Sequence, residues 1–160
     1  MAIVTYSGFA FESAAFPGVF LRMDANGVVG PVAPGAGVVN CQAFAGPWER
    51  FQFIQQPDGT TAINSVAFPK AYLRMDGTNI TQFMGSGGGV VNCQGFVGGW
   101  EKFKIQIDQS TLNLTIESVA FPGRYLRMDG NGVVSSGPGS GVVNCQFGAF
   151  SWEHFILRIP

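Results

Sequence analysis

Residues 117–129 read ESVAFPGRYLRMD, and near copies of this stretch stand at residues 12–24 (ESAAFPGVFLRMD) and 64–76 (NSVAFPKAYLRMD). Each copy is followed by Val-Val-Asn-Cys-Gln and then by Trp-Glu-x-Phe. Because the tryptophans are residues 48, 100 and 152, successive copies are 52 residues apart. A fixed period of this length indicates a repeat architecture. We therefore predict one domain, residues 1–160, built from three repeats at about 1–57, 58–109 and 110–160.

The local pattern within each repeat predicts β-strands. Apolar and polar residues alternate over Leu-Arg-Met-Asp, and no window has a helical period. We expect four strands per repeat: an opening strand such as 112–117, the Leu-Arg-Met-Asp strand, a short strand after a tight hairpin turn, and a strand after Trp-Glu. The turns are expected at 25–27, 77–79 and 130–132, the short strands at 28–29, 80–81 and 133–134, and the last strands at 51–54, 103–105 and 155–157.

Twelve short strands in three equal units would leave many unpaired edges in an open sheet. A closed barrel in which each unit adds a hairpin cap removes those edges. The expected fold is therefore all-β, a β-trefoil of three pseudo-symmetric repeats. Its core should hold the repeated apolar residues, with the tryptophans packed on the barrel: Leu21, Leu73, Leu126, Met23, Met75, Met128, Phe51, Phe103, Phe155, the paired valines before each Asn-Cys-Gln, Trp48, Trp100 and Trp152.

The composition excludes several functions. Charged residues are 12% of the chain and the net charge is −1, so the sequence has no basic excess with which to bind nucleic acid. The longest apolar runs are too short for a transmembrane helix, and we expect no membrane insertion. Residues 1–6 do not resemble a signal peptide, which predicts a cytoplasmic protein or leaderless export.

Four polar positions keep their residue type in all three repeats, whereas the surface position of Gly18 becomes Lys70 and Gly123. Two of these positions, Arg and Asp, lie two apart on a predicted strand and so share one face, opposite Leu and Met. Retained polarity indicates a shared role. The twelve candidates are Arg22, Asp24, Asn40, Gln42, Arg74, Asp76, Asn92, Gln94, Arg127, Asp129, Asn144 and Gln146.

These residues fit two interpretations that the sequence leaves open. One is a structural network in which Asp caps its turn, Asn satisfies loop carbonyls and Arg pairs with Asp. The other is a sugar site in each repeat, because these side chains donate to and accept from adjacent hydroxyls while an aromatic ring covers the apolar face of the sugar. The candidate aromatics are Phe16, Phe68, Phe121, Phe20, Tyr72, Tyr125, Phe44, Phe96 and Phe147. The third repeat differs, with one residue fewer between Asp129 and Cys145 and with Cys-Gln-Phe-Gly where the others have Cys-Gln-x-Phe.

The equivalent residues Cys41, Cys93 and Cys145 are odd in number, so we expect buried free thiols rather than a disulfide framework. A three-thiolate metal site on the threefold axis is the alternative, which nothing in the spacing favours. The single histidine, His154, aligns with Arg50 and Lys102, a variable surface position. Because catalytic sites are normally asymmetric, an enzyme is the poorest candidate, and no pair of carboxylates stands out for glycoside hydrolysis.

The pattern Phe-Pro-x-x-Tyr-Leu-Arg-Met-Asp-Gly followed by Trp-Glu-x-Phe resembles the fascin and actin-crosslinking-like branch of the β-trefoils, apart from Phe20 and Ala25 in the first repeat. The chain also resembles small fungal fruiting-body β-trefoil lectins, which are leaderless and bind galactose or N-acetylgalactosamine. The Gln-x-Trp motif of ricin-type lectins is absent. This resemblance implies a lectin with up to three equivalent sites, no catalysis, no cofactor and no required metal.

We expect glycans or glycoconjugates as partners, bound multivalently and crosslinked, and we leave a dimer open. The alternative is a protein-binding β-trefoil, either an actin crosslinker or a protease inhibitor. Trefoil inhibitors usually carry one loop unlike its symmetry mates, and actin bundlers usually carry a basic surface. With 9 Lys and Arg against 10 acidic residues and no strongly divergent loop, the sequence favours neither.

Overall fold

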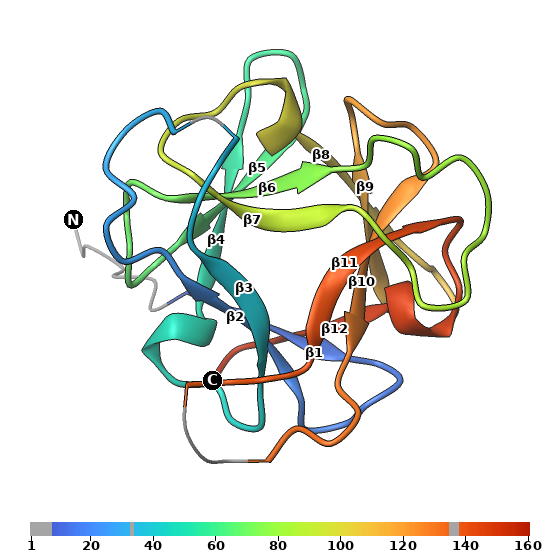
Figure 1. The fold of residues 1–160 in the computed structure, drawn as a ribbon. Coiled ribbons are helices and arrows are strands. Elements are labelled where there is room, and N and C mark those ends of the chain that lie inside the picture. Colours follow the sequence, from blue (N-terminus) through green and yellow to red (C-terminus); the bar gives the residue numbers. More distant parts are fainter. Residues whose placement is uncertain (1–7, 33, 135–137) are drawn as a thin grey trace.

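The computed structural model describes residues 8–32, 34–134 and 138–160, so the expectation about residues 1–6 lies outside it. Figure 1 shows three similar groups of strands around a central axis. The strands are β1 (Ala10–Ser13), β2 (Phe20–Asp24), β3 (Val38–Gln42), β4 (Phe51–Gln55), β5 (Thr61–Ser65), β6 (Tyr72–Asp76), β7 (Val90–Gln94), β8 (Phe103–Ile107), β9 (Leu114–Ser118), β10 (Arg124–Asp129), β11 (Val142–Phe147) and β12 (Phe155–Arg158). None of the helical segments in these ranges is long and apolar enough to cross a membrane.

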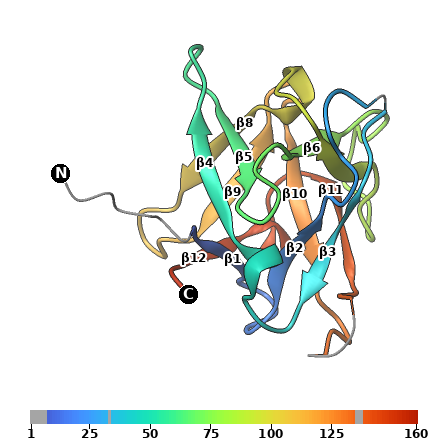
Figure 2. The same ribbon diagram turned by 90° about the vertical axis from the view of Figure 1, so that its left-hand side faces the viewer.

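Six strands form a closed barrel. Following the antiparallel pairs, β1 joins β12, β12 joins β9, β9 joins β8, β8 joins β5 and β5 joins β4. Phe9 and Phe51 then exchange two backbone hydrogen bonds of 3.0 and 2.8 Å, which link the start of β1 to β4 and close the ring. Closure leaves the barrel strands without free edges. Figure 2 shows the barrel strands from the side.

The other six strands form three hairpin caps, β2–β3, β6–β7 and β10–β11. Isolated bridges tie each cap to a neighbour, pairing Ala36 with Cys93, Gly88 with Cys145 and Ser140 with Cys41. The loop of one repeat therefore completes the cap of the next. A barrel with three such caps is the β-trefoil predicted from the sequence, with four strands in each repeat.

One strand per repeat lies elsewhere than predicted. The expected short strands at 28–29, 80–81 and 133–134 are not strands, and Val-Val-Asn-Cys-Gln forms the partner strand instead. The turns at 25–27, 77–79 and 130–132 do exist, closed by bonds such as Val28 N–H to the Ala25 carbonyl at 3.0 Å, but they lead into a longer loop. Val28 and Ile80 are buried as anchors of that loop, which explains their apolar character without pairing.

The core contains the leucines, methionines and phenylalanines predicted for it, all with no exposed surface. The two valines of each pair differ in burial, because successive residues of a strand face opposite sides of the sheet. Val39, Val91 and Val143 are buried, whereas Val38, Val90 and Val142 are about half exposed. The prediction that both valines of each pair are core residues is therefore wrong for the first of each pair.

The repeated pattern of the Phe-Pro loops has a local cause. Ser13, Ser65 and Ser118 are buried, and each accepts a hydrogen bond of 3.0 Å at Oγ from the backbone N–H of the phenylalanine three residues later. A serine turn of this kind holds the loop without a regular strand. It places the phenylalanine where it meets a tryptophan of the neighbouring repeat.

Candidate functional site

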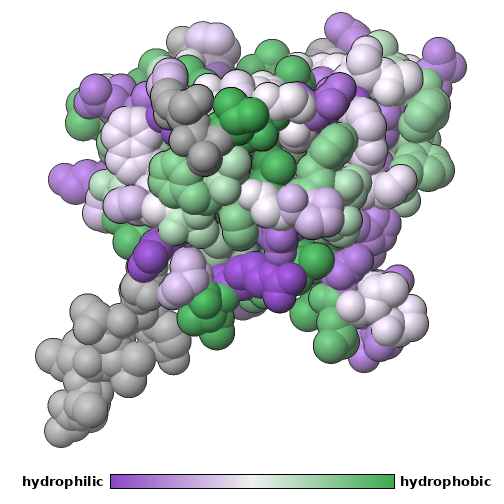
Figure 3. Space-filling model, turned by 90° about the horizontal axis from the view of Figure 1, so that it is seen from below, coloured by the Kyte–Doolittle hydropathy of each residue, from purple (hydrophilic) through white to green (hydrophobic). Residues whose placement is uncertain are grey.

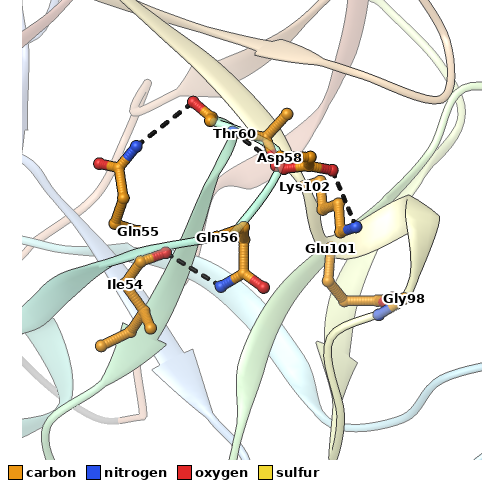
Figure 4. Close-up of polar contacts among 9 residues, drawn as sticks. Ile54, Gln55, Gln56, Asp58, Thr60, Gly98, Glu101 and Lys102 are labelled. Carbon is orange, nitrogen blue, oxygen red and sulfur yellow. Dashed lines mark hydrogen bonds and ion pairs between the residues drawn. The ribbon is translucent and has the colours of Figure 1, made fainter.

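A 3-10 turn precedes the last strand of each repeat and orients a tryptophan and a glutamate. The turns are η1 (Pro47–Glu49), η2 (Gly99–Glu101) and η3 (Ser151–Glu153). In each, the glutamate Oε1 accepts a bond of 2.8 Å from a backbone N–H three residues earlier. Figure 4 shows this contact between Glu101 and Gly98, beside the 3.0 Å ion pair that joins Lys102 to Asp58 in the β4–β5 turn. The bond directs the glutamate inward and fixes the turn that carries the tryptophan.

The tryptophans pack beside the barrel, between neighbouring repeats, and are partly exposed rather than enclosed in its core. Trp48 and Trp100 are each 37% exposed. Their rings contact a phenylalanine of the following repeat, Phe68 at 5.4 Å and Phe121 at 5.3 Å between ring centroids, and Trp152 contacts Phe16 at 5.1 Å. The tryptophans thus join neighbouring repeats while keeping part of their surface accessible.

Each tryptophan covers a buried arginine. The guanidinium carbons of Arg22, Arg74 and Arg127 lie 4.7, 4.6 and 4.6 Å from the ring centroids of their tryptophans, a cation–π geometry. Each arginine also donates a 3.2 Å hydrogen bond to the asparagine opposite it on the paired strand, Asn40, Asn92 or Asn144. The tryptophan ring and the asparagine therefore cover a guanidinium group that is almost wholly buried.

Glutamates balance these buried arginines. The arginine Nε lies 3.8 Å from Glu49 Oε2 in the first repeat and 4.0 Å from Glu101 Oε2 in the second. Burial raises the pKa of Glu49, Glu101 and Glu153, while the backbone N–H and the arginine act to lower it. Arg22 and Arg74 therefore pair with glutamate, whereas the structural interpretation of the sequence pairs arginine with aspartate.

Two equivalent cavities open beside these clusters. The second pocket, named for the repeat that supplies its tryptophan, has a volume of about 430 Å³ and is lined by Pro34, Arg74, Gln94, Phe96, Gly98, Gly99, Trp100 and Glu101. The third pocket has a volume of about 170 Å³ and is lined by Phe83, Gly85, Arg127, Gln146, Phe150, Ser151, Trp152 and Glu153. Each lies between the loop of one repeat and the Trp-Glu turn of the next. In the first repeat, the loop equivalent to these includes residues 135–137, which are outside the described residues.

The predicted glutamines lie in these pockets but are engaged by backbone. Gln94 accepts from Val32 N–H and donates to the Val32 carbonyl, both at 2.7 Å. Gln146 makes the same pair of bonds with Met84, at 2.9 and 2.5 Å. Gln42 is buried in the same way and accepts from Ala43 N–H at 2.9 Å. Gln94 and Gln146 hold the loop of the neighbouring repeat in place and so form part of the pocket wall.

The structure separates the predicted aspartates from the predicted arginines and glutamines. Asp24, Asp76 and Asp129 end their strands, and each accepts a bond of 3.0 to 3.1 Å from the backbone N–H two residues later. This is the turn-capping geometry expected of Asp. The asparagines contact the arginines, and Asn144 Nδ2 also donates to the Ser86 carbonyl at 3.1 Å. Neither residue type lines the second or third pocket.

The aromatic residue of the third pocket is missed by sequence alignment of the repeats. Phe44 and Phe96 precede their tryptophans by four residues, and the aligned residue of the third repeat is Gly148. A Cβ at Gly98 would lie 2.8 Å from Phe96 Cε2, and a Cβ at Gly148 would lie 2.8 Å from Phe150 Cε2. The order of phenylalanine and glycine is thus reversed: Phe96 and Gly98 of the second repeat align with Gly148 and Phe150 of the third. The ring of Phe150 fills the place that the ring of Phe96 fills in the second repeat. Phe147, the aromatic that the sequence suggests, lies instead over Arg124 at 5.5 Å.

The cysteines are buried and free, as predicted. Burial raises the pKa of each thiol to about 12. Each Sγ lies 3.7 to 3.9 Å from the carbonyl oxygen of an aspartate in another repeat. Within the described residues, no group of three or more His, Cys, Asp or Glu side chains is placed to hold a metal ion. His154 is half-buried, with Nδ1 2.5 Å from the Phe150 carbonyl.

No protein-family model matches the chain, and no curated protein matches it. Solved structures with a similar fold include a mosquitocidal holotoxin, at a TM-score of 0.67 and 10% identity over 99% of this chain. They also include ThreeFoil, a designed 3-fold symmetric protein, at a TM-score of 0.67 and 12% identity over 95% of this chain and 98% of ThreeFoil. The chain spans 18% of the holotoxin's length. Identities this low establish the β-trefoil fold and no closer relationship.

Proposed function

We propose that this protein is a non-catalytic carbohydrate-binding β-trefoil whose sites are the repeated pockets, with up to three sites per molecule. One observation carries the proposal: the second and third repeats both place a partly exposed tryptophan and a phenylalanine beside a buried arginine and glutamate. Apolar walls with a few oriented polar groups are typical of small-molecule sites. A hexose needs this combination, because its hydroxyls donate and accept hydrogen bonds while its C–H face packs on an aromatic ring.

The charge and the repetition support an uncharged ligand and a binding role. The net charge is −1, and Figure 3 shows apolar and polar residues interspersed over the face seen from below. Each of the two described pockets contains a single carboxylate, whereas glycoside hydrolysis generally requires two. Equivalent sites on one rigid body favour avidity for branched or clustered glycans over tight binding of one sugar.

Galactose and N-acetylgalactosamine are the sugars proposed first, from the resemblance to fungal lectins. Arg74, Gln94, Arg127 and Gln146 line the described pockets, so we place the sugar there. The aspartates and asparagines remain candidates for contacts at the rim. We expect agglutination of glycan-bearing cells that is inhibited by free galactose or N-acetylgalactosamine. If the protein binds no glycan on an array and no sugar shifts its melting temperature, the proposal is rejected.

A matched pair of variants tests where the sugar binds. Phe147 ends β11 and Phe150 lies in the loop that follows; they are 37% and 52% exposed, and of the two Phe150 lines the third pocket. We expect Phe150→Ala to weaken binding at the third site about fivefold, from the loss of roughly 1 kcal/mol of aromatic contact. Phe147→Ala should leave binding unchanged. Binding of both variants to immobilised N-acetylgalactosamine measures the difference, and equal losses would place the sugar outside the pocket.

A further inference from the structure

The third pocket differs from the second by an added phenyl ring. Phe83, from the loop of the second repeat, lies 5.2 Å from Phe150 between ring centroids, at an interplanar angle of 82°. Both rings line the third pocket and remain 57% and 52% exposed, so neither serves the core. Of the described residues that line the second pocket, Phe96 is the one phenylalanine, and the loop contributes Pro34.

The added ring stands at a position that the backbone contacts of the two loops make equivalent, although other residues of the loops also differ. Phe83 precedes Met84, whose backbone N–H and carbonyl bind the amide of Gln146. In the second pocket, Val32 binds Gln94 in the same way, and the residue before Val32 is Pro31. Pro31 is therefore the structural counterpart of Phe83. The two pockets form a natural comparison within one molecule.

The third pocket, which contains Phe83, is smaller than the second. The volume of the third pocket, about 170 Å³, is below the roughly 300–1,000 Å³ of sites for drug-sized ligands, while the 430 Å³ of the second falls within that range. The third pocket thus suits one sugar ring. Its two phenyl rings, at an interplanar angle of 82°, form an apolar corner beside the side chains of Arg127 and Glu153.

We infer that the third pocket selects acetamido sugars over the corresponding plain hexoses, and that the second pocket does not; this inference rests on the proposed carbohydrate function. The acetamido group supplies both a methyl group for the phenyl corner and an amide for the polar groups. Burial of one methyl group contributes about 0.8 kcal/mol, which corresponds to about a fourfold preference in affinity.

The tryptophans provide a separate reporter for each pocket. The indole N–H resonance of Trp100 reports on the second pocket and that of Trp152 on the third, so titrations with N-acetylgalactosamine and with galactose can be followed site by site by NMR. We expect Trp152 to report about fourfold tighter binding of N-acetylgalactosamine than of galactose. Trp100 should report equal affinities for the two sugars.

Two variants test the role of the added phenyl ring, one by removing it from the third pocket and one by adding a ring to the loop at the second. Phe83→Ala, at a 57% exposed position, should abolish the preference at Trp152 and leave Trp100 unchanged. Pro31→Phe should create a preference at Trp100. Equal ratios at both reporters in the wild-type protein, or a preference that survives Phe83→Ala, would overturn the inference. If neither indole responds to either sugar, the proposed function itself fails.

Discussion

At the scale of single residues, the repeated polar positions divide into three different roles. Arg74 is buried between Trp100 and Glu101, Gln94 binds the backbone of Val32, and Asp76 caps its own turn. The sequence identifies these positions as important because their polarity recurs. It does not distinguish the roles, because the partners are backbone groups and side chains of other repeats that no local pattern specifies.

The buried carboxyl group of Glu101 should make the stability of the fold depend on pH. Burial raises its pKa in the folded protein, so between the unfolded and the folded pKa the native state binds more protons than the unfolded state. The free energy of unfolding therefore falls as the pH rises through this window, which begins near 4.5. Glu101→Gln keeps an oxygen to accept from Gly98 N–H and removes the titration.

We expect the unfolding free energy of Glu101→Gln, measured with denaturant at a series of pH values, to fall less steeply with pH than that of the wild type above pH 4.5. The difference should build up over the window and stay constant above it. Identical slopes in the two proteins would show that the environment of Glu101 does not favour its protonated form.

At the scale of elements, the loop that follows the second strand of each repeat connects the units. Gly35, Gly87 and Gly139 all have positive φ and lie against the arginine and asparagine of the next repeat. A Cβ at Gly87 would lie 2.6 Å from the Cys145 carbonyl oxygen and 2.7 Å from Arg127 Cδ. This close approach explains why glycine recurs at these positions.

Substitution of Gly87 should therefore destabilise the protein beyond the backbone effect. Gly132 is a matched control, because its φ of +78° is similar to the +66° of Gly87 but a Cβ added there would meet no atom within 4 Å. Both alanine variants carry left-handed strain, and only Gly87→Ala adds overlap, which typically costs about 1–3 kcal/mol. We expect Gly87→Ala to unfold at lower denaturant than Gly132→Ala; equal midpoints would contradict the packing described for the loop.

Some strands and side-chain positions could be predicted from the sequence, and others could not. Strands such as β2 and β4 are predictable because a two-residue alternation directly reports burial on one face. The strand β3 is missed because Val28 and Val29 resemble a strand as strongly as Val38 and Val39 do, and only the pairing of β2 with Val38–Gln42 decides between them. The place of Phe150 is missed because its ring reaches the pocket from a backbone position two residues away from that of Phe96.

At the scale of the whole molecule, threefold repetition determines both the fold and the number of candidate sites. The period of 52 residues, together with four short strands in each repeat, predicts a closed β-trefoil. Each described pocket requires two repeats, because one supplies the loop and the next supplies the Arg-Trp-Glu cluster. The sites therefore depend on assembly of the whole barrel, and departures from symmetry such as Phe83 can diversify them without altering the fold.

The most direct measurement of the central claim is a crystal structure of the protein soaked with N-acetylgalactosamine. We expect the sugar beside Trp100 and Trp152, with its ring against the aromatic side chains and its hydroxyls within hydrogen-bonding distance of the neighbouring arginine and glutamate. Pockets that stay empty at saturating sugar, or sugar bound only at the turns capped by Asp76 and Asp129, would contradict the assignment of these pockets as the carbohydrate sites.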